Sequence, residues 1–119
     1  ATQKLIALIA AMAYDTLFFD FVYEVIREKM IVGSNELTDS DVRVFFKDKQ
    51  QQNEKVAVWT DATLVRLGRC YKTMLYEAGL IDKAKTTRKI LKPIFDPELS
   101  RWLEQNDMAI YEKALTGVK

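Results

Sequence analysis

The sequence has 119 residues, 49% of them hydrophobic, and its 18 basic and 17 acidic residues leave a net charge of +1. This length suits one compact domain, over residues 1–119, that buries a core without a metal or a disulfide. The single cysteine excludes a disulfide within the chain, and the absence of histidine removes the commonest metal ligand and general base. We therefore expect a reduced, cytoplasmic protein.

The first predicted element is an apolar helix over residues 5–14, followed closely by Asp15, Asp20 and Glu24. The uninterrupted apolar run is too short to span a bilayer, where buried carboxylates would each cost a few kcal/mol. We predict no membrane segment. The pattern indicates a core helix that is broken or bent near Asp15, with a second core helix over residues 18–30.

Two further helices are predicted, with a connection between them. Thr38 is the expected cap of the first, Val42 one of its inward residues, and the polar residues 50–53 its end. The second follows the cap Thr60 and stops at Gly79, where a left-handed conformation is available. Two helices joined in this way are typical of a helix-turn-helix, although this connection is longer than the usual tight turn.

The helix between Thr60 and Gly79 has two distinct sides. Its apolar side chains recur at three- and four-residue steps on one side, and they are Leu64, Leu67, Tyr71, Met74, Leu75 and Ala78. On the other side, Arg66, Arg69, Thr73 and Tyr76 fall within roughly a quarter turn of one another. We predict that these four side chains form one solvent-exposed stripe.

A short basic segment, residues 82–92, follows Gly79, and we interpret it as a short β-hairpin or wing. From Asp61 to Lys92, eight basic residues outnumber three acidic ones, a net charge of +5 that leaves −4 for the rest of the chain. Such segregation is typical of a surface that binds a polyanion. Charge alone fits a merely solvated face equally well, and the coincidence of charge, helix and wing favours nucleic acid.

The C-terminal part predicts two more helices. Asp96 is the expected cap of the first, with Pro97 at its first position and Trp102 and Leu103 facing inward, and residues 108–115 form the last helix. The predicted fold class is therefore mainly α. We expect a small helical domain with a helix-turn-helix or winged-helix-like core and a short β-hairpin.

Four segments carry a resemblance to a known family, and they are residues 21–29 (FVYEVIREK), 37–41 (LTDSD), 64–80 and 90–93 (ILKP). They look like the C-terminal part of the BrxA family of BREX bacteriophage-defence systems. The resemblance covers nearly the whole chain. It implies a mainly helical, non-enzymatic, bacterial DNA-binding protein that works beside a DNA methyltransferase and ATPases of the same system. Family members have further helices upstream, so the helical start at Ala1, without a methionine, leads us to expect a piece of a longer protein.

We predict that the chain binds duplex DNA, largely through phosphate contacts. The predicted nucleic-acid-binding residues are Arg66, Arg69, Lys72, Thr73, Lys83, Lys85, Arg88 and Lys89. The sequence has no glycine-rich phosphate loop, no nucleophile elbow and no cluster of zinc ligands. We therefore expect no enzymatic activity, no metal, no cofactor and no small-molecule substrate.

The alternative is a protein-interaction or scaffolding module of the same defence complex, without direct nucleic-acid binding. In that case aromatic side chains such as Tyr76 or Tyr111 would dock another BREX protein, and the basic stripe would meet an acidic protein surface. Competition by duplex DNA discriminates between the two hypotheses. The sequence leaves open the choice between DNA and RNA, the sequence preference and the oligomeric state.

Overall fold

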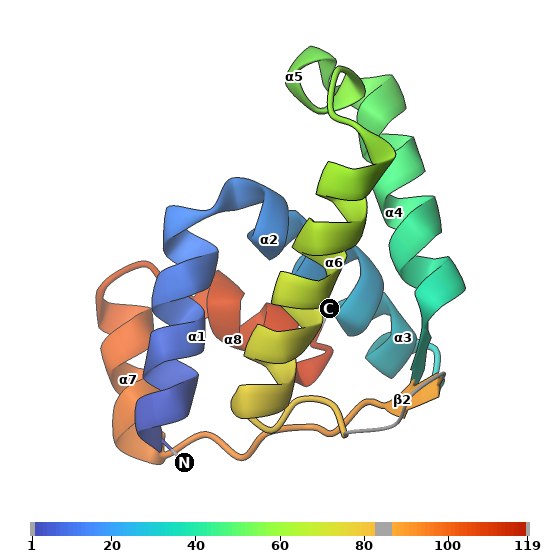
Figure 1. Ribbon diagram of the computed structural model, residues 1–119. Coiled ribbons are helices and arrows are strands. Elements are labelled where there is room, and N and C mark those ends of the chain that lie inside the picture. Colours follow the sequence, from blue (N-terminus) through green and yellow to red (C-terminus); the bar gives the residue numbers. More distant parts are fainter. Residues whose placement is uncertain (1, 83–86, 119) are drawn as a thin grey trace.

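The computed structural model describes residues 2–82 and 87–118, which fold into a mainly helical domain (Figure 1). The elements are α1 (Thr2–Tyr14), α2 (Thr16–Phe21), the π-helical η1 (Val22–Ile26), α3 (Arg27–Ile31), β1 (Glu36–Thr38), α4 (Asp39–Gln52), α5 (Glu54–Ala57), α6 (Asp61–Glu77), β2 (Thr87–Lys89), α7 (Pro97–Gln105) and α8 (Ala109–Thr116). The predicted mainly α class is confirmed at this level.

The N-terminal helices bend sharply at Asp15, as the acidic interruption predicted. Residues Gln3–Tyr14 and Thr16–Ile31 meet at 110°. The side chain of Asp15 caps the second helix, because its Oδ1 accepts a hydrogen bond from the backbone N–H of Phe18 at 3.2 Å. Of the described helices, none by itself has the length and hydropathy to cross a bilayer, and only this bent pair meets both criteria when its two helices are counted together.

Three helices, α4, α6 and α7, begin at the side-chain caps that the sequence predicted. Thr38 and Asp41 form a capping box at the start of α4, and Thr60 accepts a hydrogen bond from the backbone of Thr63 at the start of α6. Asp96 caps α7 with Pro97 in its first turn. Each cap satisfies a backbone N–H that the helix itself leaves unpaired. These boundaries confirm the predicted starts.

The prediction that Trp102 faces inward is wrong. Leu103 is fully buried, whereas Trp102 is 51% exposed. Leu99 and Leu103 define the inward side of α7, and at about 100° per residue Trp102 falls at the margin of that side. The helix therefore packs along a narrow stripe that excludes the indole.

The strands form a two-stranded antiparallel sheet between distant parts of the chain. β1 pairs with β2 in the register Glu36↔Lys89, Leu37↔Arg88 and Thr38↔Thr87. After α6 the chain also returns on itself, because Ile81 and Ile90 form an antiparallel bridge. The prediction of a hairpin within residues 82–92 is corrected in one respect. The strand β2 of this segment pairs with β1, which lies about 50 residues earlier in the chain. The buried side chain of Leu37 gives β1 its place in the core.

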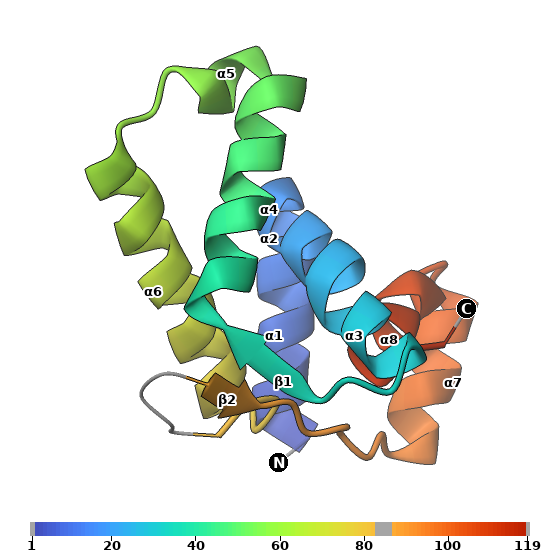
Figure 2. The same cartoon turned by 90° about the vertical axis from the view of Figure 1, so that its right-hand side faces the viewer.

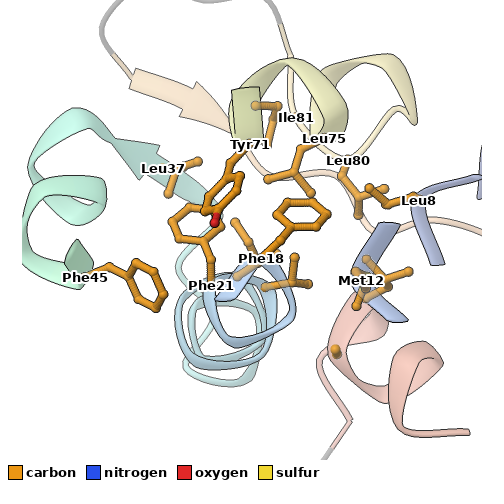
Figure 3. Close-up of a cluster of buried hydrophobic side chains, with 14 of the residues drawn as sticks. Leu8, Met12, Phe18, Phe21, Leu37, Phe45, Tyr71, Leu75, Leu80 and Ile81 are labelled. Atoms are coloured by element: carbon orange, nitrogen blue, oxygen red, sulfur yellow. The ribbon is translucent and has the colours of Figure 1, made fainter. Parts of the chain in front are cut away.

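The core is centred on Tyr71 of α6 (Figure 3). Its ring centroid lies 4.9 Å from that of Phe18, 5.6 Å from that of Phe21 and 5.7 Å from that of Phe46. These rings come from α2, α4 and α6, so one aromatic cluster joins the N-terminal helices to the pair that carries the basic surface. The orientation of α6, and with it the direction of its outer face, follows from this packing.

A buried lysine also ties α4 to the N-terminal helices. Lys49 lies 3.3 Å from Asp20 and 2.8 Å from Glu24. Burial alone would lower the pKa of Lys49, but the two carboxylates raise it on balance. The ammonium group therefore remains charged at neutral pH, and the ion pairs offset the cost of burying it.

Candidate nucleic-acid interface

The candidate interface begins with the outer face of α6. The apolar side chains Leu64, Tyr71 and Leu75 are buried, whereas Arg66 and Arg69 are exposed. Two predicted neighbours on the same stripe are also exposed, Thr73 and Tyr76. The predicted division of this helix into a core side and a solvent side is therefore confirmed. Two arginines and a threonine on one helix face can donate to phosphates or to base edges.

A groove of about 460 Å³ lies between α4 and α6. Figure 2 shows these helices side by side, with α5 at one end and the strands β1 and β2 at the other. The charged side chains that line the groove are Asp39, Arg43, Lys47, Asp61, Arg69 and Lys72, four basic and two acidic. Because Arg69 belongs both to the groove and to the outer stripe of α6, the two basic surfaces are continuous.

Gly68 of α6 lies close to side chains of α4. A Cβ atom added there would lie 3.0 Å from Cγ1 of Val42 and 3.7 Å from the Phe46 ring. Such a contact is closer than ordinary van der Waals distance, so glycine lets α4 and α6 pack this closely. The spacing of the basic side chains across the groove depends on this approach.

At one end of the groove, a single carboxylate oxygen binds two cations. Oδ1 of Asp39 lies 3.0 Å from the Lys72 ammonium group and 3.1 Å from Nη1 of Arg88. The hydrogen bond from Lys72, together with the charges of Lys72 and Arg88, holds the pKa of Asp39 below its usual range, although partial burial acts in the opposite direction. These contacts connect the start of α4, the middle of α6 and β2.

The structure separates the predicted binding residues into three groups. Exposed side chains are those of Arg66, Arg69, Thr73 and Lys89. Lys72 and Arg88 are turned toward Asp39, and each side chain is only 18% exposed. The other two predicted residues, Lys83 and Lys85, lie outside the described residues.

The sequence analysis missed Arg43 and Lys47. Both are exposed side chains of α4 that line the groove, and they are four residues apart, so they share one side of the helix. That spacing was visible in the sequence. Their position opposite α6 was not, because it depends on how the two helices pack.

The described residues offer no alternative site built on metal chemistry. Residues 2–82 and 87–118 contain no group of three or more cysteine or acidic side chains that could hold a metal ion. The aromatic residues named for protein docking differ in exposure. Tyr76 is 44% exposed, whereas Tyr111 is half-buried and its ring forms a T-shaped pair with Phe19. Tyr76 lies on the basic stripe itself.

The chain is similar to known proteins of one family. A family model described as BrxA matches residues 1–107. A curated protein of Bacillus cereus (strain H3081.97), named BREX protein BrxA, is 39% identical to this chain over 116 residues. The matched part covers 98% of this chain and 58% of that relative, so the chain spans a little more than half the relative's length. No solved structure matches the chain.

Proposed function

This chain belongs to the BrxA family, and we propose that it is a non-enzymatic, duplex-DNA-binding component of a bacterial BREX phage-defence system. Membership rests on the family model, which matches residues 1–107, and the similar protein of Bacillus cereus is named as a BREX protein. The DNA-binding part of the proposal rests on one observation, the exposed arginines on the outer face of a helix that is rigidly packed through its other face.

The order of elements around α6 supports a winged-helix mode of binding. β1 leads into α4, α5 connects α4 to α6, and the chain then returns through the Ile81–Ile90 bridge to β2, which pairs with β1. In this mode α6 is the recognition helix and the basic segment over residues 82–92 is the wing. The connection through α5 is longer than a tight turn, as the sequence indicated.

The proposed contacts follow from exposure and charge. Arg66, Arg69 and Thr73 project from α6 toward the major groove, which is wide enough to admit an α-helix. Lys89 contacts backbone phosphates from β2, the strand within the wing, and Lys83 and Lys85 remain predicted phosphate contacts of the same wing. Phosphate contacts position a protein without reading sequence, so we expect weak sequence preference.

Fluorescence anisotropy of a labelled duplex, titrated with this chain at several salt concentrations, tests the proposal. If about five phosphates are neutralised, the logarithm of affinity falls with the logarithm of salt concentration at a slope of about −4 to −5. Unlabelled duplex displaces the probe, and an RNA competitor shows whether the surface prefers DNA. Absence of binding at low salt contradicts the proposal for this chain.

A protein-interaction module of the same system is the second candidate function. The observation that favours it is the exposed ring of Tyr76 beside Arg69 and Thr73, because tyrosine and arginine are enriched at protein interfaces. An acidic protein surface would then occupy the basic stripe. Duplex DNA that fails to displace such a partner would favour this function over DNA binding.

A further inference from the structure

The contact of Asp39 with Lys72 and Arg88 stands out within the candidate interface. Both cations donate to the same carboxylate oxygen, at 3.0 and 3.1 Å. The three charges sum to +1, so the carboxylate leaves one unit of positive charge uncompensated. A phosphate diester offers the same kind of acceptor as the carboxylate, namely negatively charged oxygens that accept charge-assisted hydrogen bonds from both donors.

We propose that Lys72 and Arg88 form a phosphate-binding subsite that Asp39 occupies in the free protein and that a backbone phosphate of the duplex takes over on binding. The inference rests on the proposed function. It adds that the Asp39 carboxylate competes with the duplex for the same two cations. Asp39 thereby holds down the affinity for any polyanion, whatever its sequence.

The burial of the three side chains supports an exchange of anions at this point. Lys72 and Arg88 are each 18% exposed, so both are largely withdrawn from water, and a charged acceptor binds such groups more strongly than it binds fully hydrated ones. The Asp39 side chain is 48% exposed, so solvent and ligands reach it. A phosphate can therefore approach the subsite from the side on which the carboxylate lies.

The surroundings of Asp39 favour a second anion. Arg43 follows Asp39 by one helical turn on α4, and Arg69 precedes Lys72 by one turn on α6, and all four side chains line the same groove. Asp39 is ionised at neutral pH, because its pKa is held low. The competition is thus between two anions for the same cations, and it requires no change in protonation.

The test compares Asp39→Asn with Asp61→Asn. Asp61 lines the same groove and its loss changes the net charge by the same amount, but no ion pair with Lys72 or Arg88 involves it. Since the incoming phosphate no longer has to displace Asp39 from Lys72 and Arg88, Asp39→Asn is expected to raise duplex affinity at a fixed low salt concentration by about three- to tenfold. Asp61→Asn is expected to raise that affinity much less, because only the long-range field changes.

Two further measurements complete the test. Adding Arg88→Gln to Asp39→Asn is expected to remove most of the gained affinity, because one of the two cations that hold the phosphate is lost. Inorganic pyrophosphate is expected to raise the melting temperature of Asp39→Asn by more than that of Asp61→Asn, because a ligand that binds only the folded state stabilises it. This second readout does not depend on duplex binding by the wild type.

The outcomes separate the subsite from the proposed function. Equal duplex affinities of the two variants, with equal responses to pyrophosphate, overturn the subsite even if the wild type binds duplex. A wild type that does not bind duplex, together with a selective pyrophosphate response of Asp39→Asn, overturns DNA binding by this chain and supports the subsite.

Discussion

The double variant Arg66→Ala/Arg69→Ala is expected to lose about ten- to a hundredfold in duplex affinity at low salt, and the magnitude of its salt slope is expected to fall by about 2. Both side chains are exposed on the outer face of α6, so their removal takes away two of the proposed DNA contacts and leaves the core unchanged. Anisotropy titrations at several salt concentrations measure the loss. Thermal unfolding is expected to match the wild type.

A matched control is Arg101→Ala/Lys113→Ala. These exposed cations lie on α7 and α8, on the opposite side of the domain from α6 in Figure 2, and their removal changes the net charge by the same amount. The control is expected to lose much less affinity, because only the long-range field changes. Equal losses of affinity in the two double variants would mean that the DNA site lies elsewhere, or that binding depends only on the net charge of the protein.

Tyr71→Ala is expected to give the largest loss of stability, about 3 to 5 kcal/mol in the free energy of unfolding. The ring is 2% exposed and contacts Phe18, Phe21 and Phe46, so its removal leaves a cavity at the point where three helices meet. Urea unfolding followed by circular dichroism measures the change. A loss below about 1 kcal/mol would contradict the central role of this ring in the core.

Tyr71→Phe tests the contribution of the Tyr71 hydroxyl separately from that of the ring. The Tyr71 hydroxyl is buried and finds no hydrogen-bond partner among the described residues, and burial raises the pKa of this phenol. Leaving such a group unpaired costs about 1 to 3 kcal/mol, so removing the oxygen while keeping the ring is expected to preserve or increase stability. A clear destabilisation by Tyr71→Phe would show that the hydroxyl has a partner in solution.

Local signals explain which parts of the fold the sequence predicted. A cap involves residues at most three positions apart, as with Thr38 and Asp41, and a left-handed stop such as Gly79 at φ 82° is set by one residue. The division of α6 into two sides follows from helical periodicity alone. For this reason the helix starts, the bend at Asp15 and the exposed stripe could all be predicted.

Features that depend on tertiary packing could not be predicted in this way. Lys72 and Arg88 were predicted as free phosphate contacts, but both bind Asp39, which is 33 and 49 positions away in the sequence. The pairing of β2 with β1 and the groove position of Arg43 also depend on how α4 and α6 approach each other. The count of charges along the sequence locates a basic segment. Only the fold shows which of its cations are paired with a carboxylate of the protein itself.

The most direct test of the account is to titrate the isotope-labelled chain with a short duplex and to map the amide chemical-shift changes by nuclear magnetic resonance. The account predicts that the largest changes fall on α6 between Arg66 and Tyr76 and on the segment around Lys89, with smaller ones on the groove side of α4. Changes concentrated on α7 and α8, or absent from α6, would contradict it.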